Sequence, residues 1–223
     1  MSKFVITIDG PAASGKGSLS KKISKELNFY YLETGIYYRG LANLFYKNKS
    51  NSSDINLFIS TLNIKVFEEY IKRNKENFYS AKVSKLASKL AKNFNVRAFI
   101  VKIQQEIIIS LDKKYYGIIL EGRDCGTVIA PYADLKFYLI SNLEIRAKRR
   151  FRQFVMDKKD ISYEQVLCDL KERDIQDKNR EHSPLQKPKD AVVVDNSDNN
   201  FEATINIVKN IIFSRIPSLK KKI

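Results

Sequence analysis

The stretch from residue 4 to residue 18 reads Phe-Val-Ile-Thr-Ile-Asp-Gly-Pro-Ala-Ala-Ser-Gly-Lys-Gly-Ser and decides the fold class. Its apolar start predicts a buried strand over residues 4–8, and an amphipathic helical pattern follows the glycines. A glycine-rich turn between a strand and a helix directs backbone N–H groups at phosphate oxygens, while Lys16 reaches the terminal phosphates. The sequence therefore predicts a phosphate-binding loop made of Gly10, Pro11, Ala12, Ala13, Ser14, Gly15, Lys16, Gly17 and Ser18.

Four further apolar runs lie along the chain, and helical patterns such as Leu19, Ile23 and Leu27 separate them. The runs lack the polar alternation of a half-exposed sheet, so we expect buried parallel strands joined by right-handed crossovers. The predicted fold class is α/β, a three-layer arrangement with helices on both faces of a five-stranded parallel sheet. The predicted strands cover residues 4–8, 29–32, 117–120, 135–139 and 191–194.

Two regions interrupt the alternation of strands and helices. A polar loop at 47–56 opens a long helical excursion, which we interpret as a substrate-binding insert over about 47–111. A capping box, Ser162 to Gln165, starts a charged helix inside the second region, and we expect about 149–189 to form a lid. Residues 1–223 are predicted to be a single domain with its core at 1–46, 112–148 and 190–219, and Lys220 to Lys222 a frayed tail.

The composition restricts the class of protein. A formal charge of +15 suits a protein that meets polyanions, but the lysines are scattered, so a solvated surface is favoured over a dedicated nucleic-acid face. No apolar run is long enough to span a membrane, and the N-terminus does not have the pattern of an export signal. The two cysteines have neither metal-type nor redox-type spacing. We expect a cytoplasmic, monomeric protein with no membrane partner, no specific nucleic-acid partner and no cluster of protein metal ligands.

The eight glycines gather in three places, and most lie at or just beyond the end of a predicted strand. The second cluster follows the second strand, in Leu32-Glu33-Thr34-Gly35-Ile36-Tyr37-Tyr38-Arg39. The third follows the third strand, in Glu121-Gly122-Arg123-Asp124-Cys125-Gly126-Thr127. The ligand crevice of an open parallel sheet lies at the carboxyl ends of its strands, so we expect the substrate site to be there.

Together with the phosphate loop, these segments resemble the cytidylate kinase family. The resemblance extends over almost the whole chain, through Ala87-Ser88-Lys89, Val96-Arg97 and Glu172-Arg173-Asp174 to Arg180. Gly17 directly after Lys16 is the loop variant of nucleoside monophosphate kinases, in which phosphates and water hold Mg²⁺ more than the Ser18 hydroxyl does. The resemblance implies a kinase domain that uses ATP and Mg²⁺ to phosphorylate CMP or dCMP in pyrimidine nucleotide metabolism.

The resemblance also implies roles for individual residues. Lys16, Arg123, Arg173 and Arg180 would serve catalysis, and the loop from Gly10 to Ser18 would bind ATP. The substrate CMP would be bound by Thr34, Arg39, Ser88, Arg97, Arg123, Asp124, Arg173, Asp177 and Arg180. Thr34, Arg39, Arg123 and Arg180 would hold the acceptor phosphate, Arg173 and Asp177 the sugar and the closing lid, and Ser88, Arg97 and Asp124 would read cytosine.

The chemistry of these residue types agrees with the implied substrate. Asp124 could accept a hydrogen bond from the cytosine amino group, while Arg97 and Ser88 could donate to its acceptors. Arg173, Asp177 and Arg180 have the spacing i, i+4 and i+7, which predicts one helical face. From spacing alone that face could equally be a solvated set of salt bridges.

Four positions depart from the family pattern. Glu33 and Glu121 stand where the family usually has Asp, and Tyr79 and Gln105 stand where Arg is common. Because most of these changes concern the acceptor side, a kinase for another small acceptor, such as UMP, AMP or shikimate, stays open. A basic nucleic-acid-dependent ATPase and a non-catalytic nucleotide sensor are the remaining alternatives.

Overall fold

The computed structural model describes residues 3–48, 54–158, 160–197 and 200–220. Half of the predicted polar loop at 47–56, residues 49–53, and residues 221–222 of the predicted tail lie outside these residues. Within the described residues, no helix is long and apolar enough to cross a membrane.

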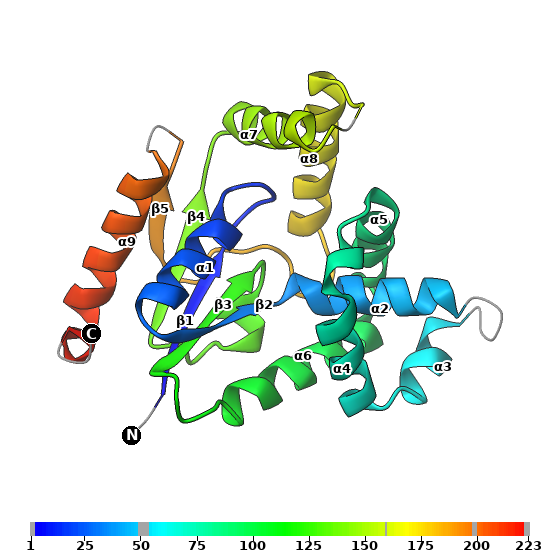
Figure 1. Ribbon diagram of the computed structural model, residues 1–223, viewed down its shortest axis with the longest axis horizontal. Helices are drawn as coiled ribbons and strands as arrows, with labels where there is room; N and C mark the ends of the chain where they lie inside the picture. Colours follow the sequence, from blue (N-terminus) through cyan, green and yellow to red (C-terminus); the bar gives the residue numbers. More distant parts are fainter. Residues whose placement is uncertain (1–2, 49–53, 159, 198–199, 221–223) are drawn as a thin grey trace. The chain divides into compact units, whose positions relative to one another are not determined.

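The predicted five-stranded parallel sheet is confirmed (Figure 1). The strands are hydrogen-bonded in the order β2-β3-β1-β4-β5, so the strand that leads into the phosphate loop is the central one. Their bounds are β1 Phe4–Asp9, β2 Phe29–Glu33, β3 Gly117–Gly122, β4 Leu135–Ile140 and β5 Val192–Asp195.

The expectation of uniformly buried strands holds for the inner strands and is wrong for the outer ones. Five of the six residues of β1 and of β3 and four of the six of β4 are buried, whereas only two of the five residues of β2 and one of the four in β5 are. Val193 on β5 is 45% exposed. Both outer strands are sheet edges, with a neighbouring strand on one side only, so their side chains keep more contact with solvent.

The chain forms two compact units. One, which we call the sheet unit, comprises Met1–Leu32 and Leu111–Ile223, and the other, the helical unit, comprises Glu33–Ser110. The predicted division into core, insert and lid stays a prediction, and each unit is described by itself.

In the sheet unit, α1 (Lys16–Glu26) and α9 (Phe201–Arg215) share one hydrophobic core with the strands (Figure 1). The helical period expected for α1 is confirmed, because Leu19, Ile23 and Leu27 are buried in this core. Helix α9 contributes Ile205, Val208 and Ile212 and is followed by the short 3-10 turn η3 (Pro217–Leu219). This packing fixes the position from which the phosphate loop enters α1.

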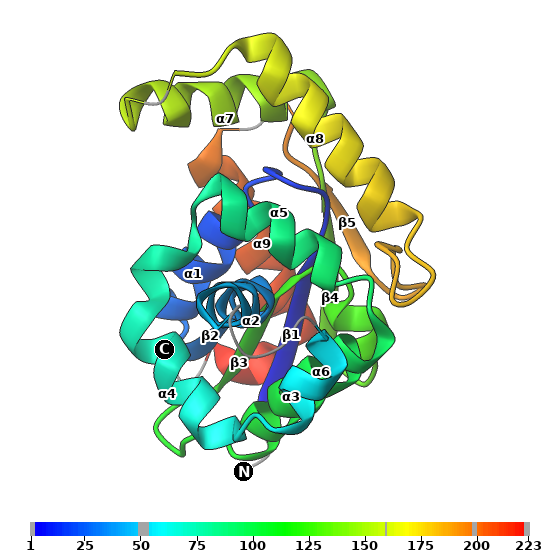
Figure 2. The same ribbon diagram turned by 90° about the vertical axis from the view of Figure 1, so that its right-hand side faces the viewer.

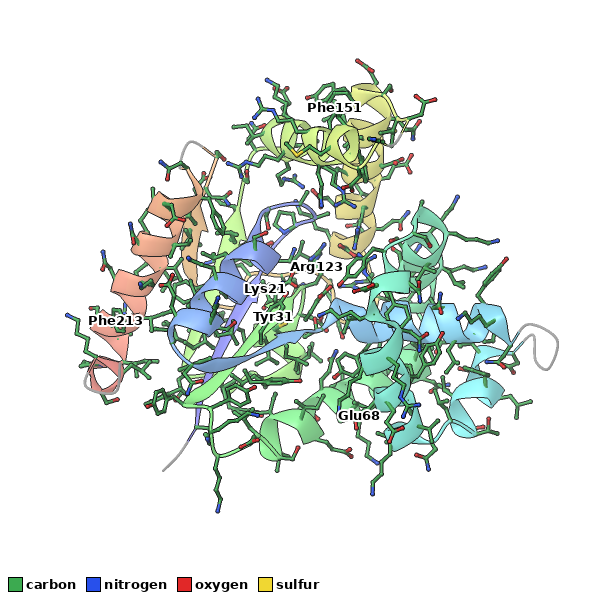
Figure 3. The ribbon with its side chains drawn as sticks, in the orientation of Figure 1. Lys21, Tyr31, Glu68, Arg123, Phe151 and Phe213 are labelled. Atoms are coloured by element: carbon green, nitrogen blue, oxygen red, sulfur yellow. The ribbon has the colours of Figure 1, made fainter. Side chains whose placement is uncertain are left out.

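Helices α7 (Leu143–Met156) and α8 (Tyr163–Lys178) pack against each other, as Figure 2 shows. Phe151, labelled in Figure 3, meets Tyr163 edge-on with 6.1 Å between the ring centroids. The predicted cap is confirmed, since the Ser162 hydroxyl accepts the N–H of Gln165 at 3.1 Å. Arg180 does not share a helical face with Arg173 and Asp177 as expected, because α8 ends at Lys178.

The helical unit contains α2 (Gly35–Lys47), α3 (Ile55–Ser60), α4 (Ile64–Asn74), α5 (Ala81–Leu90) and α6 (Phe94–Ile109), with the 3-10 turn η1 (Lys75–Phe78) between α4 and α5. Four of these helices begin at a side-chain cap, because the oxygens of Asp54, Asn63, Ser80 and Asn93 each accept a first-turn N–H. Phe67 and Phe78 are fully buried within the unit. The caps and this aromatic core fix the helices that carry the predicted acceptor residues.

Candidate functional site

The phosphate loop connects β1 to α1 through backbone conformations that few residues adopt. Gly15 has φ +88° and Ala13 has φ +57°, both in the left-handed region. A Cβ on Gly10 would lie 2.2 Å from the carbonyl oxygen of Leu139. Helix α1 begins directly after Gly15, and among the described residues no side chain caps its first turn. The helix N-terminus therefore offers its N–H groups to an anion, as the sequence predicted.

Three side chains from distant parts of the sheet unit hold the loop backbone. The Asn196 amide donates to the carbonyl of Ser14 at 2.7 Å. Asp174 on α8 accepts the N–H of Ala12 at 3.1 Å, and Arg146 on α7 donates to the carbonyl of Ala12 at 2.9 Å. Arg146 and Asp174 also form an ion pair at 2.6 Å. We call Arg146, Asp174 and Asn196 the loop clamp.

Sequence reasoning missed the clamp. The basic run Arg146, Lys148, Arg149, Arg150 and Arg152 has the sequence pattern of a partly solvated helix face. For Arg146 that interpretation is wrong, since it is 5% exposed. Asp174 lies in the Glu172-Arg173-Asp174 motif, where the resemblance predicts a site role for Arg173 but none for Asp174. The available signal was its position among the predicted site residues of α8.

The Lys16 ammonium lies inside this arrangement rather than in solvent. It donates to the Pro11 carbonyl at 2.9 Å and lies 3.5 Å from a carboxylate oxygen of Glu121. Burial and, to a smaller extent, the neighbouring Arg123 lower the pKa of Lys16 to about 7, against an opposing increase from Glu121. A lysine in this state readily gains charge when an anion such as a phosphate approaches.

Arg123, Asp177 and Arg180 form an ionic cluster in the sheet unit. Arg123, labelled in Figure 3, donates through Nε to Asp177 at 2.8 Å, and Arg180 lies 3.9 Å from the other carboxylate oxygen. Burial would raise the pKa of Asp177, but Arg123, Arg173 and Arg180 together hold it below its ordinary value. The carboxylate thus stays ionised and orients guanidinium groups that can bind phosphate oxygens.

Asp124 lies between β3 and a π-helical turn, η2 (Cys125–Ile129). It is 5% exposed, and its backbone carbonyl accepts the N–H groups of Val128 and Ile129 at 2.9 Å and 3.2 Å. A nearly buried carboxylate in a hydrogen-bonded turn is suited to reading one polar group of a ligand.

The helical unit carries the remaining predicted acceptor residues. Thr34 is 3% exposed and stands at the N-cap position of α2, and its backbone carbonyl accepts the Gln104 amide at 3.0 Å. Arg97 on α6 is 3% exposed, lies over the Tyr38 ring and donates to the Ala91 carbonyl at 3.3 Å. Ser88 lies partly buried on α5. Thr34, Ser88 and Arg97 thus lie buried or partly buried in the helical unit.

Arg39 lies in a network of polar and aromatic contacts that includes Glu33 and Tyr79, two positions that depart from the family pattern. Its guanidinium donates to the Ser84 hydroxyl at 2.6 Å and lies 5.2 Å from the centre of the Tyr79 ring. The Tyr79 hydroxyl lies 3.0 Å and 3.1 Å from the two carboxylate oxygens of Glu33, and Lys75 is 3.8 Å from the same carboxylate. The two unusual residues therefore contact each other beside Arg39.

The structure thus brings the loop, Lys16, Arg123, Asp177 and Arg180 together in the sheet unit. It places Thr34, Arg39, Ser88 and Arg97 in the helical unit.

Comparison with known proteins identifies relatives over nearly the full chain. The family profile described as Cytidylate kinase matches residues 6–214. Proteins named Cytidylate kinase from Thermosipho africanus and Bartonella henselae are 38% and 37% identical over 216 and 215 residues. The Thermosipho alignment covers 94% of this chain and 95% of the relative, and the Bartonella alignment 95% of each.

Among solved structures, shikimate kinase from Bacteroides thetaiotaomicron matches with a TM-score of 0.51 at 11% identity, covering 95% of this chain and 99% of the other. The protein TT1252 from Thermus thermophilus matches with a TM-score of 0.52 at 14% identity, covering 97% and 99%. At these identities the likeness concerns the fold alone.

Proposed function

The chain belongs to the cytidylate kinase family, and from that premise we propose that it transfers the terminal phosphate of ATP to CMP or dCMP. The products are CDP or dCDP, within pyrimidine nucleotide metabolism. We place the reaction in the cytoplasm and expect the active protein to be a monomer. The observation that carries the proposal is the buried Lys16 at the start of a helix that no described side chain caps.

On the donor side, the loop from Gly10 to Ser18 binds the phosphates of ATP. The N–H groups at the start of α1 donate to phosphate oxygens, and the glycines let the backbone approach them closely. Lys16 adds a positive charge, which the phosphates stabilise by raising its lowered pKa. The loop clamp holds the backbone of Ala12 and Ser14 in place through hydrogen bonds while the phosphates are bound.

On the acceptor side, charged side chains bind the phosphate and polar ones read the base. Thr34, Arg39, Arg123 and Arg180 are assigned to the acceptor phosphate, and Arg173 with Asp177 to the sugar and the closing lid. Asp124 accepts from the cytosine amino group, and Ser88 and Arg97 donate to its acceptors. Uracil has a carbonyl in place of the cytosine amino group and could not donate a proton to Asp124. Asp124 would therefore favour cytosine over uracil.

Phosphoryl transfer depends on alignment and on charge neutralisation, so a strong general base is not required. Lys16 and the arginines of the ionic cluster neutralise the charge of the transferring group, and the planar guanidinium groups fix its direction. Mg²⁺ fits this site, because the phosphates bound at the α1 N-terminus would hold it, with the exposed Ser18 hydroxyl at the same helix start. When bound, Mg²⁺ supplies further neutralisation of the phosphate oxygens.

A panel of acceptors tests the proposal. ADP release would be measured with CMP, dCMP, UMP, AMP and dTMP at equal concentrations, with ATP and Mg²⁺ in excess. We expect CMP or dCMP to give the highest kcat/KM. A preference for AMP, or ATP turnover that no nucleotide stimulates, would overturn the cytosine assignment.

A further inference from the structure

Asp9 is a fully buried acid for which the mechanism above has no use. It is the last residue of β1, directly before the phosphate loop, and is 0% exposed. An ionised carboxylate removed from water is costly unless hydrogen bonds compensate it. The hydrogen bonds of the Asp9 carboxylate therefore indicate its structural role.

Both carboxylate oxygens of Asp9 bind the backbone of the η2 turn. Oδ1 accepts the N–H of Cys125 at 2.9 Å, and Oδ2 accepts the N–H of Gly126 at 2.8 Å. The pairing of β1 with β3 ends at Asp9 and Gly122. The two Asp9 hydrogen bonds therefore attach the segment after β3 to β1 beyond the end of the strand pairing. Asp124 directly precedes the two residues that are held.

Close packing leaves the turn little room to shift. A Cβ on Gly126 would lie 2.8 Å from the Thr7 hydroxyl oxygen and 2.9 Å from Cγ of Pro188. Thr7 belongs to the same strand as Asp9, so β1 both binds the turn and packs against it. The position of Asp124 is thus set from β1 by two hydrogen bonds and one tight contact.

We infer that Asp9 is a positioning residue for the acceptor base, which fixes the turn that presents Asp124 without touching the nucleotide itself. The inference rests on the proposed role of Asp124 in reading cytosine. Because Asp9 acts on the acceptor turn through side-chain oxygens, while its own backbone leads into the phosphate loop, its replacement should weaken CMP binding more than ATP binding.

The titration of Asp9 gives this role a measurable signature. Burial and, to a smaller extent, the neighbouring Asp124 raise its pKa to about 6, against the lowering effect of the two backbone hydrogen bonds. The other titratable or charged groups facing this region are the Cys125 thiol on η2 and, on β4, the Tyr138 phenol and the Lys136 side chain that packs against Gly126. Below about pH 6 one oxygen carries a proton and becomes a weaker acceptor for its N–H, so the turn should loosen as pH falls.

The first experiment replaces the carboxylate by its isosteric amide. In Asp9→Asn, one oxygen is replaced by an NH2 group that faces a backbone N–H, so the KM for CMP should rise about tenfold while the KM for ATP changes less than about twofold. Asp134→Asn is the matched control, because Asp134 accepts the N–H of Val5 at 2.7 Å near the other end of β1. Both KM values should stay unchanged in that control.

The second measurement follows the KM for CMP between pH 7.5 and 5.5. The second ionisation of the CMP phosphate, with a pKa of about 6, affects wild type and variant alike, so the Asp9 contribution is the difference between them. The ratio of the two KM values should therefore be largest at pH 7.5 and shrink towards pH 5.5, where wild type also loses an acceptor.

Three outcomes separate the possible failures. Wild type that does not phosphorylate CMP contradicts the proposed function rather than the role of Asp9. Wild type that does, with Asp9→Asn raising both KM values equally or neither, overturns the inference. If Asp9→Asn does not fold, Gly126→Ala decides the question, since it displaces the same turn and should raise the KM for CMP selectively; an unchanged value would overturn the inference.

Discussion

The phosphate loop of the sheet unit and Arg39 of the helical unit are held in place in different ways. Buried side chains distant in sequence fix the loop, with Arg146 and Asp174 both bound to Ala12 and Asn196 bound to Ser14. Arg39 instead depends on Ser84 and on the ring of Tyr79, which is 44% exposed. Buried hydrogen bonds are stronger than exposed ones and cost more to leave unsatisfied.

This difference indicates where the chain can change without losing its fold. Three of the four departures from the family pattern, Glu33, Tyr79 and Gln105, lie in the helical unit. There the Tyr79 hydroxyl donates a hydrogen bond to the Glu33 carboxylate. With a rigid ATP-binding side and an adaptable CMP-binding side, ATP use would stay constant among family members while the affinity for the acceptor varies. The following substitutions test this contrast.

The largest effect is expected for Lys16→Ala. Loss of the ammonium removes a charge from the phosphate site, so kcat with ATP and CMP should fall at least about 100-fold. Steady-state kinetics at saturating substrates measures this. Lys21→Ala is the control, since Lys21 is exposed on the same helix and should change kcat little. Similar losses in both variants would contradict the special position of Lys16.

Arg146→Ala tests whether the clamp is as rigid as its burial indicates. The substitution leaves the Asp174 carboxylate buried without its ionic partner, which should reduce the free energy of unfolding by about 3 kcal/mol in urea denaturation. Arg152→Ala, an exposed position on α7, should change it by less than about 0.5 kcal/mol. The double variant Arg146→Met with Asp174→Leu should recover part of the loss. If Arg146→Ala left the free energy of unfolding unchanged, the loop clamp would not be the rigid element that the comparison with Arg39 assumes.

Asp124→Ala tests whether the effect of a substitution follows the assigned ligand, CMP, or the unit in which the residue lies. Asp124 belongs to the rigid sheet unit but is assigned to the acceptor, so the KM for CMP should rise by about 10- to 100-fold and that for ATP little. Equal changes in both would contradict the assigned role. Cys125→Ser, at the next buried position, controls for a general disturbance of the turn.

The loop and the strands were predictable because their signals are local. Hydrophobic runs define the strands, and glycine clusters follow three of them; all five predicted strands lie within two residues of the observed bounds. Strand order is a property of the whole sheet, however, so the exposure of β2 and β5 was not visible in their residues.

The loop clamp could not be predicted, because its partners are far apart in sequence. Arg146 and Ala12 are separated by 134 positions, and Asn196 and Ser14 by 182. A buried arginine on a basic helix has the same local pattern as an exposed one until its partner is known. The face expected for Arg173, Asp177 and Arg180 failed for another reason, since the end of α8 at Lys178 breaks the helical count.

The pH dependence of ATP binding tests the burial of Lys16. Its pKa of about 7 leaves most of the side chain neutral at pH 8, and bound phosphates favour the charged form. ATP binding should therefore take up nearly one proton at pH 8 and close to none at pH 6. Titration calorimetry in two buffers of different ionisation enthalpy measures the uptake. Lys16→Arg stays charged throughout this range and should show none; equal uptake by both proteins would assign the proton elsewhere.

The smallest effect is expected for Tyr79→Phe, on the adaptable side of the comparison. The change removes the hydrogen bond to Glu33 and keeps the ring beside Arg39, so the KM for CMP should rise about threefold and that for ATP should not change. Tyr79→Leu also removes the contact between the ring and the guanidinium and should add a further factor of about 2 to 5. Tyr132→Phe, at a tyrosine that is 60% exposed in the sheet unit, controls for the loss of a phenol. A 100-fold effect of Tyr79→Phe would show that Arg39 depends on this exposed network as strongly as the loop depends on its buried clamp, and the proposed contrast between a rigid donor side and an adaptable acceptor side would then be wrong.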